Sequence, residues 1–394
     1  MSSTLLAQLS EGLRERLQQT PDPVAAEALA IAETSGLPEA RTESWRYSSL
    51  RLMQRALRPT EASPLNSAPL DFVCAQPGSD DAPDWVVAGA AKLGDERRSP
   101  DQAFAWLARA AGCEQLTLTR NQIQPLYFDP LAGLSRELPH RHRQVIVEAG
   151  AEITVVEHYR DGEHGNFANL LQEIAVGAGA TLRWIRLVEA HSDSHLIVRS
   201  EFDLAAGAKL IHHNLELSSA WSRQDLRVRL GGEEAELISH GLLPLAGKRH
   251  ADTQLEVIHA FGNSRSQMRW RGVAAERARA VFNGRILIEA GADGSDAALN
   301  TSSLLLSPHA EIDAKPELEI YADAVKAAHG AAIGQLDPAA LFYMRSRGLP
   351  EAQARQLLMA SFCRHALDDL SPELLTAVEA RVDHAIAALH RGNA

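Results

Sequence analysis

The stretch EAGAEI, residues 148–153, decides the fold because four later stretches repeat its pattern. In four of the five stretches an alanine returns after 27 to 29 residues, at positions 151, 180, 208 and 235. A small residue at one fixed point of each period is what the turns of a β-solenoid require, because successive coils stack closely there. The four later stretches are VGAGATL (176–182), LAAGAKL (204–210), GEEAEL (232–237) and SPHAEI (307–312).

Short runs of alternating apolar residues fill the spaces between these repeats. Examples are ITVVEHY (153–159) and HLIVRSEFDL (195–204), where Val, Ile and Leu recur with a period of two, as in β-strands. No helical pattern of useful length interrupts residues 115–335, which counts against alternating strands and helices. The repeat favours a β-solenoid, and a β-sandwich with Gly/Ala turns remains the alternative.

Helices are expected on both sides of this core. A helix from about Pro23 should end at Gly36, and residues 59–84, rich in Pro, Ser, Ala and Asp, read as a linker. The leucines that recur every four residues near the start, and so share a helix face, are Leu5, Leu9, Leu13 and Leu17.

The end of the chain carries clear helix boundaries. Asp337 and Ser371, each followed by proline, are predicted N-caps, and Gly348 is predicted to end the first of these helices. The expected domains are a helical domain with its linker (1–114), a β-solenoid core (115–336) and a C-terminal helical domain (337–394).

Composition excludes several classes of protein. The 394 residues are 45% hydrophobic and 23% charged, and the formal net charge is −12, so the basic surface of a nucleic-acid binder is missing. No apolar run is long enough to span a membrane, and the first 20 residues do not resemble a secretion signal. Three widely spaced cysteines do not form a disulfide framework. We therefore expect a cytoplasmic protein without membrane or nucleic-acid partners.

The usual catalytic motifs are absent from the sequence. There is no GxxxxGK[ST] phosphate loop, no GxSxG, no HExxH and no CxxC pair, so we expect no enzyme activity of the chain by itself. A solenoid enzyme acting on polysaccharides is the alternative, with carboxylates such as Glu233, Glu234, Asp293 and Asp296, although GADGSDA around Asp293 is typical of a turn. A purely structural, self-polymerising solenoid is a third hypothesis.

Histidines are numerous, and most are predicted to be structural. His140 and His142, in PHRHR, are typical of a solvated loop rather than of a metal site. His212 and His213 are expected to point to opposite faces of one strand, so they cannot easily share a metal.

For five further histidines, the sequence gives weaker indications of their position or role. His191 and His195 flank a Ser/Asp turn and are expected at the surface. His240, His250 and His259 are far apart along the chain and could approach one another only through the stacking of coils, so a metal site there is the less favoured reading.

A set of longer phrases resembles the SufD family of the SUF iron–sulfur cluster assembly system. The resemblance covers most of the chain and is loosest between residues 60 and 270. The related SufB subunits share the core but have a longer, cysteine-bearing chain, so SufD is the better match. The matching phrases are GLPEARTESWRYSSL (36–50), FNGRI (282–286), AEIDAKPELEIYADAVK (310–326), HGAAIGQLD (329–337) and LFYMRSRG (341–348).

This resemblance implies a mainly β fold with a right-handed parallel β-helix core between two helical domains. It also implies a non-catalytic scaffold subunit of a SufBCD complex. The chain would pair with SufB through the β-helix core, or form a homodimer when isolated, and would bind the SufC ATPase through its C-terminal helices. No cofactor would be stably bound, and iron or a nascent iron–sulfur cluster would be shared transiently with SufB.

His329 aligns with an interface histidine that the family carries in the phrase Cys-Ser-His-Gly-Ala. The resemblance therefore implies that His329 is a ligand of iron or of the nascent cluster at the SufB interface. Ala327 occupies the family's thiol position, so this chain offers no thiolate there. The structural alternative is that His329 only forms a hydrogen bond where the last strand meets the C-terminal helices.

Overall fold

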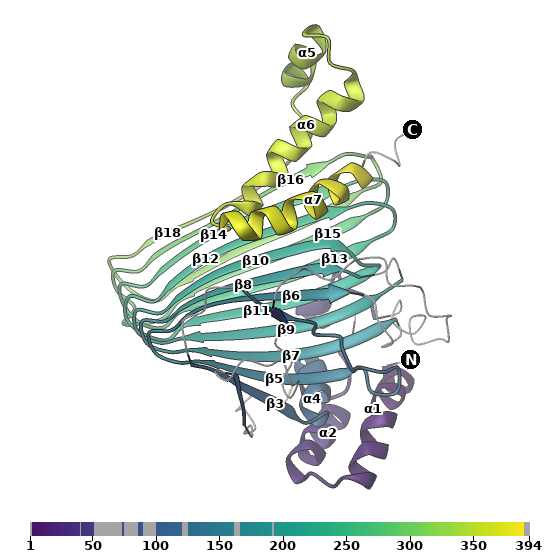
Figure 1. The fold of residues 1–394 in the computed structure, drawn as a ribbon, viewed down its shortest axis with the longest axis vertical. Coiled ribbons are helices and arrows are strands. Elements are labelled where there is room, and N and C mark those ends of the chain that lie inside the picture. The colour runs from purple at the N-terminus through teal and green to yellow at the C-terminus, as the bar shows by residue number, and fades with distance from the viewer. Residues whose placement is uncertain are drawn as a thin grey trace.

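The structure is a computed structural model that describes residues 2–39, 41–50, 73–74, 86–89, 100–119, 125–160, 166–190 and 193–389 (Figure 1). Two long, mainly parallel sheets form its core, and helices lie at both ends of the chain (Figure 1). The predicted mainly β fold with a parallel β-solenoid core is confirmed. The linker predicted over 59–84 lies outside the described residues, apart from a short strand at Val73–Cys74.

The chain alternates between the two sheets, so each pair of consecutive strands from β5–β6 to β17–β18 forms one of about seven coils. All neighbouring strands pair in parallel except β2 and β3, which excludes the antiparallel β-sandwich. Sheet A contains β1 (Val73–Cys74), β4 (Leu126–Phe128), β6 (Glu152–Arg160), β8 (Thr181–Glu189), β10 (Lys209–Ser218), β12 (Glu236–Leu245), β14 (Arg265–Ala274), β16 (Asp296–Leu305) and β18 (Lys326–Gly334). Sheet B contains β2 (Val86–Gly89), β3 (Cys113–Leu118), β5 (His140–Val147), β7 (Phe167–Val176), β9 (His195–Leu204), β11 (Trp221–Leu230), β13 (His250–His259), β15 (Arg279–Ile288) and β17 (Glu311–Ile320).

The repeated alanines explain how the coils stack. Each lies buried just before a strand of sheet A, in the same register from coil to coil. In the turns, the backbone N–H of Gly150 donates to Ala178 O and that of Gly179 donates to Ala206 O, both at 2.9 Å. Gly150 and Gly179 have positive φ angles, which glycine adopts without strain. The stacked alanines are Ala151, Ala180, Ala208 and Ala235.

The inward-facing side chains of both sheets fill the lumen of the solenoid with a continuous apolar core. Trp184 makes edge-to-face contacts with Phe128 and Phe202, with ring centroids 6.2 and 5.6 Å apart. Further along the lumen, Trp270 occupies the space that a side chain at Gly241 would need, because a Cβ there would lie 1.9 Å from Trp270 Cε3. The lumen is therefore a packed core.

The N-terminal helices cover part of the outer face of sheet B. They are α1 (Ser2–Gln19), α2 (Pro23–Ser35) and α4 (Ala103–Ala110), with short 3₁₀ segments η1 (Glu43–Trp45) and η2 (Pro100–Gln102). The predicted helix face is confirmed, since Leu5, Leu9 and Leu13 are buried. Asp22 caps α2 by accepting from two backbone N–H groups, and Gly36 ends it, as predicted. The apolar side chains of these helices form one cluster with residues of sheet B, such as Trp221 on β11, so the helices pack directly on the sheet.

The prediction of a solvated loop at His140 and His142 was wrong. Both lie on β5 and are almost fully buried, because the N-terminal helices cover this face of sheet B. His140 Nε2 is 3.0 Å from the carbonyl oxygen of Leu9 in α1, and His142 Nε2 is 2.6 Å from Glu173 Oε2. An outward-facing polar strand residue is thus buried wherever a helix lies over the sheet.

Two other histidine predictions are tested by the described residues. His212 and His213 do point to opposite faces of β10: His212 meets Phe202 in the lumen, and His213 reaches the C-terminal helical region. His195, at the start of β9, is partly buried rather than fully at the surface, and burial lowers its pKa. His191 lies outside the described residues.

The C-terminal helices are α5 (Pro338–Ser346), α6 (Glu351–Arg364), the 3₁₀ segment η3 (His365–Leu367) and α7 (Pro372–Ala388). They pack on sheet A through α7 and through the end of α6. Asp337 and Ser371 cap α5 and α7 as predicted. Helix α7 lies along the outer face of sheet A, whereas α5 and most of α6 project away from it (Figure 1). None of the described helices combines the length and apolar character needed to cross a membrane.

We expect the stability of this fold to decrease on acidification. Burial lowers the pKa of five histidines from 6.5, to about 3 for His212 and to about 4 for His140, His213, His250 and His259. Unfolding exposes these side chains, so the unfolded state binds more protons between about pH 6.5 and pH 4, and the free energy of unfolding falls as pH falls through that window. Urea titrations followed by circular dichroism at about pH 7.5 and about pH 5 measure this. An equal or higher midpoint at the lower pH would contradict it.

The packing of Trp270 against Gly241 gives a second prediction. Gly241→Ala should destabilise the fold by about 1–3 kcal/mol, because the new methyl group must displace a buried indole. Gly334→Ala is the matched control, since a Cβ at that position has no neighbouring atom within 4 Å. Thermal unfolding of both variants checks this, and equal melting temperatures would show that the lumen is not tightly packed at Trp270.

Candidate functional site

The last coil forms an open end of the solenoid. Strand β17 ends sheet B and β18 ends sheet A, and within the described residues no strand pairs with their outer edges. One coil earlier, Ile288 is fully buried, whereas its register partner Ile320 is 42% exposed and Ile333 on β18 is 46% exposed. The last coil therefore exposes apolar side chains that a further coil would cover.

His329 lies at this open end, on the side of β18 that faces the lumen. It pairs in register with Leu299 of β16, a buried member of the lumen core, and neighbours in a parallel sheet point to the same side. His329 is exposed because none of the described coils covers it. Ala327, two residues earlier, points to the same side, so both positions of the family phrase face the open lumen.

The structural alternative for His329 is not supported. His329 is in the interior of β18, well before α5 begins at Pro338, rather than at a junction between strand and helix. Within the described part of the chain, no hydrogen bond or ion pair involves its side chain. The imidazole is therefore free to meet a ligand or a partner at the open end.

The chain supplies no thiolate to accompany this imidazole among its described side chains. Burial raises the pKa of the Cys113 and Cys363 thiols to about 12, so both are protonated at neutral pH. In the described regions, no group of three or more His, Cys, Asp or Glu side chains could hold a metal ion, so His240, His250 and His259 do not form a site either. A metal bound at His329 would need ligands from outside this part of the chain.

The projecting helices α5 and α6 form a second candidate surface, which we call the arm (residues 338–364). No residue of α5 is buried, and three large apolar side chains of the arm are exposed: Phe342 by 73%, Tyr343 by 59% and Leu357 by 46%. Exposed apolar groups concentrated on one element are typical of a protein-binding surface.

The base of the arm is fastened to sheet A by polar contacts. The rings of His213 on β10 and His240 on β12 are stacked, with centroids 5.0 Å apart. His213 Nε2 donates to the carbonyl oxygen of Asp368 at 2.8 Å, and His240 Nε2 is 2.9 Å from Asp369 Oδ2. Both aspartates lie in the turn between η3 and α7, shortly after the arm ends, so the chain is joined to the sheet at a defined point next to the arm. The sequence showed these histidines but not their partners.

A Ser–His–Asp cluster that the sequence analysis missed proves to be structural. Ser48 Oγ is 3.0 Å from His250 Nε2 and also donates to Asp252, but all three side chains are buried and out of reach of a substrate. Arg223 binds Asp252 at 2.7 Å and lies over the Trp45 ring at 4.1 Å. The cluster fastens the N-terminal SWRYS segment to sheet B.

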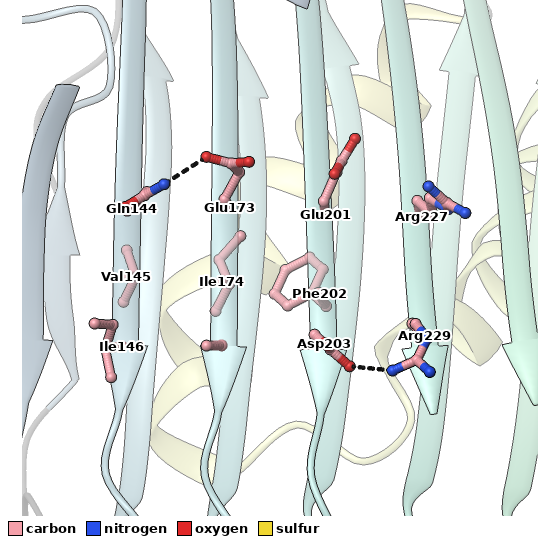
Figure 2. A pocket seen from close by; sticks show the side chains of 11 residues that line it. Gln144, Val145, Ile146, Glu173, Ile174, Glu201, Phe202, Asp203, Arg227 and Arg229 are labelled. Carbon is pink, nitrogen blue, oxygen red and sulfur yellow. Dashed lines mark hydrogen bonds and ion pairs between the residues drawn. The ribbon is translucent and has the colours of Figure 1, made fainter. Parts of the chain in front are cut away.

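A hollow of about 410 Å³ lies on the outer face of sheet B, across β5, β7, β9 and β11 (Figure 2). Its charged side chains are already paired: Asp203 with Arg229 at 3.4 Å, and Glu173 with Gln144 at 2.8 Å. Burial alone would raise the pKa of Glu173, but the hydrogen bond from His142, the Arg109 charge and the Gln144 amide lower it to about 2. A glycan hydrolase needs one carboxyl group that stays protonated, and Glu173 does not provide it.

The comparison with known proteins agrees with this geometry. A family model described as "SUF system FeS cluster assembly, SufBD core domain" matches residues 132–362. The chain is 30% identical over 380 residues to the iron–sulfur cluster assembly protein SufD of Escherichia coli (strain K12), covering 89% of each chain. It is 28% identical over 362 residues to the SufBD family protein Rv1462 of Mycobacterium tuberculosis, covering 88% of this chain and 89% of the relative.

A third relative is the SufD protein of Bacillus subtilis, which is 33% identical over 141 residues, or 34% of this chain and 32% of the relative. The family model spans more than half of the chain and includes the coils, the open end and most of the arm. The resemblance to SufD seen in the sequence is thereby confirmed. The chain belongs to the SufBD family of the SUF system for iron–sulfur cluster assembly.

Proposed function

We propose that this chain is a non-catalytic scaffold subunit of a SUF complex. Its open last coil pairs with a SufB-type subunit, its arm binds the SufC-type ATPase, and His329 is a ligand of iron or of the nascent cluster where the two cores meet. The observation that carries this proposal is a last coil whose outer edges pair with none of the described strands, with an exposed imidazole on its lumen side.

The unpaired edges of β17 and β18 give the pairing its physical basis. Their free backbone N–H and C=O groups can bind a strand of another chain, and that chain would also cover apolar side chains such as Ile320 and Ile333. A related solenoid fits this end because its strands have the same spacing. A second copy of this chain is the alternative occupant when no SufB-type subunit is present.

The chemistry of His329 suits a transient iron site. A neutral imidazole binds iron well, and a single ligand from this chain leaves the remaining coordination positions to the partner and to the incoming cargo. Because Ala327 stands at the family's thiol position, this position supplies no thiolate, and we expect thiolate ligands from the partner. Iron and the cluster are the cargo of the complex and are not resident cofactors of this chain.

The arm supplies the link to ATP hydrolysis. The sequence has no phosphate-binding loop, so the energy of ATP must come from another subunit. Aromatic side chains that are exposed on a helix are frequent anchors of protein interfaces, and Phe342 and Tyr343 provide two on successive positions of α5.

His329→Ala should leave the complex intact but impair its cluster assembly. The substitution removes the proposed ligand while keeping the backbone pairing of β18. We expect the variant to co-purify normally with its SufB- and SufC-type partners and to form much less cluster, as followed by iron content and visible absorbance after reconstitution. Normal cluster formation would refute the ligand role, while loss of the complex would point to a structural role for His329.

The two docking surfaces should be separable by mutation. Ile333→Glu places a charge at the open end and should abolish co-purification of the SufB-type subunit, while the ATPase remains bound. Phe342→Ser removes an arm anchor and should have the opposite effect. Pull-down from co-expressed subunits measures both. If either variant loses both partners while remaining folded by circular dichroism, the assignment of two independent surfaces is wrong.

A further inference from the structure

Arg271 connects the arm to the outer face of sheet A. It lies on β14, partly buried beneath the end of α6, with its guanidinium carbon 5.5 Å from the centre of the Phe362 ring. Burial lowers its pKa, and its Nε has no hydrogen-bond partner among the described residues. A buried guanidinium N–H without a partner is costly.

From Arg271 the contacts lead toward the open end. Arg271 Nη1 donates to Asn300 Oδ1 on β16 at 3.0 Å. Asn300 pairs in register with Gly330 on β18, and its Nδ2 lies 3.8 Å from where a Cβ of Gly330 would be. Gly330 directly follows His329. Side-chain contacts therefore run from α6 through Arg271 to Asn300, and the backbone pairing of β16 with β18 continues the series to the residue beside the exposed imidazole.

Asn300 also accepts a second hydrogen bond. Ser302 Oγ on the same strand donates to Asn300 Oδ1 at 3.4 Å, beside the bond from Arg271, so two donors hold the amide oxygen at once. The contacts of His213 and His240 hold the base of the arm at β10 and β12, on the side away from β18.

We propose that Arg271 and Asn300 are positioning residues that transmit movement of the arm to β18 and so to His329. The inference deepens the proposed function, because it names the route by which a partner bound to the arm would act on the cluster ligand. When α6 shifts, Phe362 moves Arg271, and the hydrogen bond from Arg271 to Asn300 passes the displacement to β16. The backbone pairing of β16 with β18 then passes it to the strand that carries His329.

Hydrogen exchange of the isolated chain, read by mass spectrometry, tests this route without any partner. Phe362→Ala should speed exchange in residues 326–334 by about fivefold in the otherwise unchanged chain. In an Asn300→Ala background the same substitution should have no further effect there, because the route is already broken. Asn300→Asp keeps the acceptor and should restore the response. Arg271→Met should also abolish the response of residues 326–334 to Phe362→Ala, because it removes the guanidinium that lies between Phe362 and Asn300.

Ser302→Ala is the matched control, since it lies on the same strand but does not contact Arg271. It should leave the response to Phe362→Ala intact. The inference is overturned if Phe362→Ala loosens residues 359–367 without changing residues 326–334, or if its effect is equal with and without Asn300. Unchanged exchange in residues 152–189 excludes general unfolding as the cause. Failure of this test leaves the docking surfaces and the role of His329 untouched, because those are measured in the complex.

Discussion

Each strand of the solenoid pairs its backbone N–H and C=O groups with the strands of the coils before and after it, and this ladder organises the rest of the molecule. It fixes the register, and the register places the stacked alanines, the lumen aromatics and the outward-facing histidines. Within the described residues the ladder is incomplete at β17 and β18. The same interaction that stabilises each inner coil therefore leaves the last one able to bind another chain.

The sequence predicted those parts of the structure that repeat or that have strong local signals. The alanine period predicted the solenoid, and the caps at Asp337 and Ser371 predicted helix starts correctly. It failed at His140 and His142, because burial there depends on helices distant in sequence that cover β5. Contacts between segments that are distant along the chain leave no pattern in the local sequence.

The candidate site was predictable only in part, for a related reason. The family phrase identified His329, but only the register with Leu299 places it on the lumen side at an open end. The connection from Phe362 through Arg271 to Asn300 joins three elements whose order in space is set by the coils. In the function we propose, these tasks are separate: the sheet edge would supply pairing, the arm would supply a second contact, and the imidazole of His329 would supply the chemistry.

The most direct test of the central claim is a cryo-EM structure of the chain bound to its SufB- and SufC-type partners. The account predicts that a strand of the SufB-type subunit is hydrogen-bonded to β17 or β18, so that His329 lies at the interface between the two cores. A structure in which that subunit binds elsewhere, with β17, β18 and His329 left open to solvent, would contradict it.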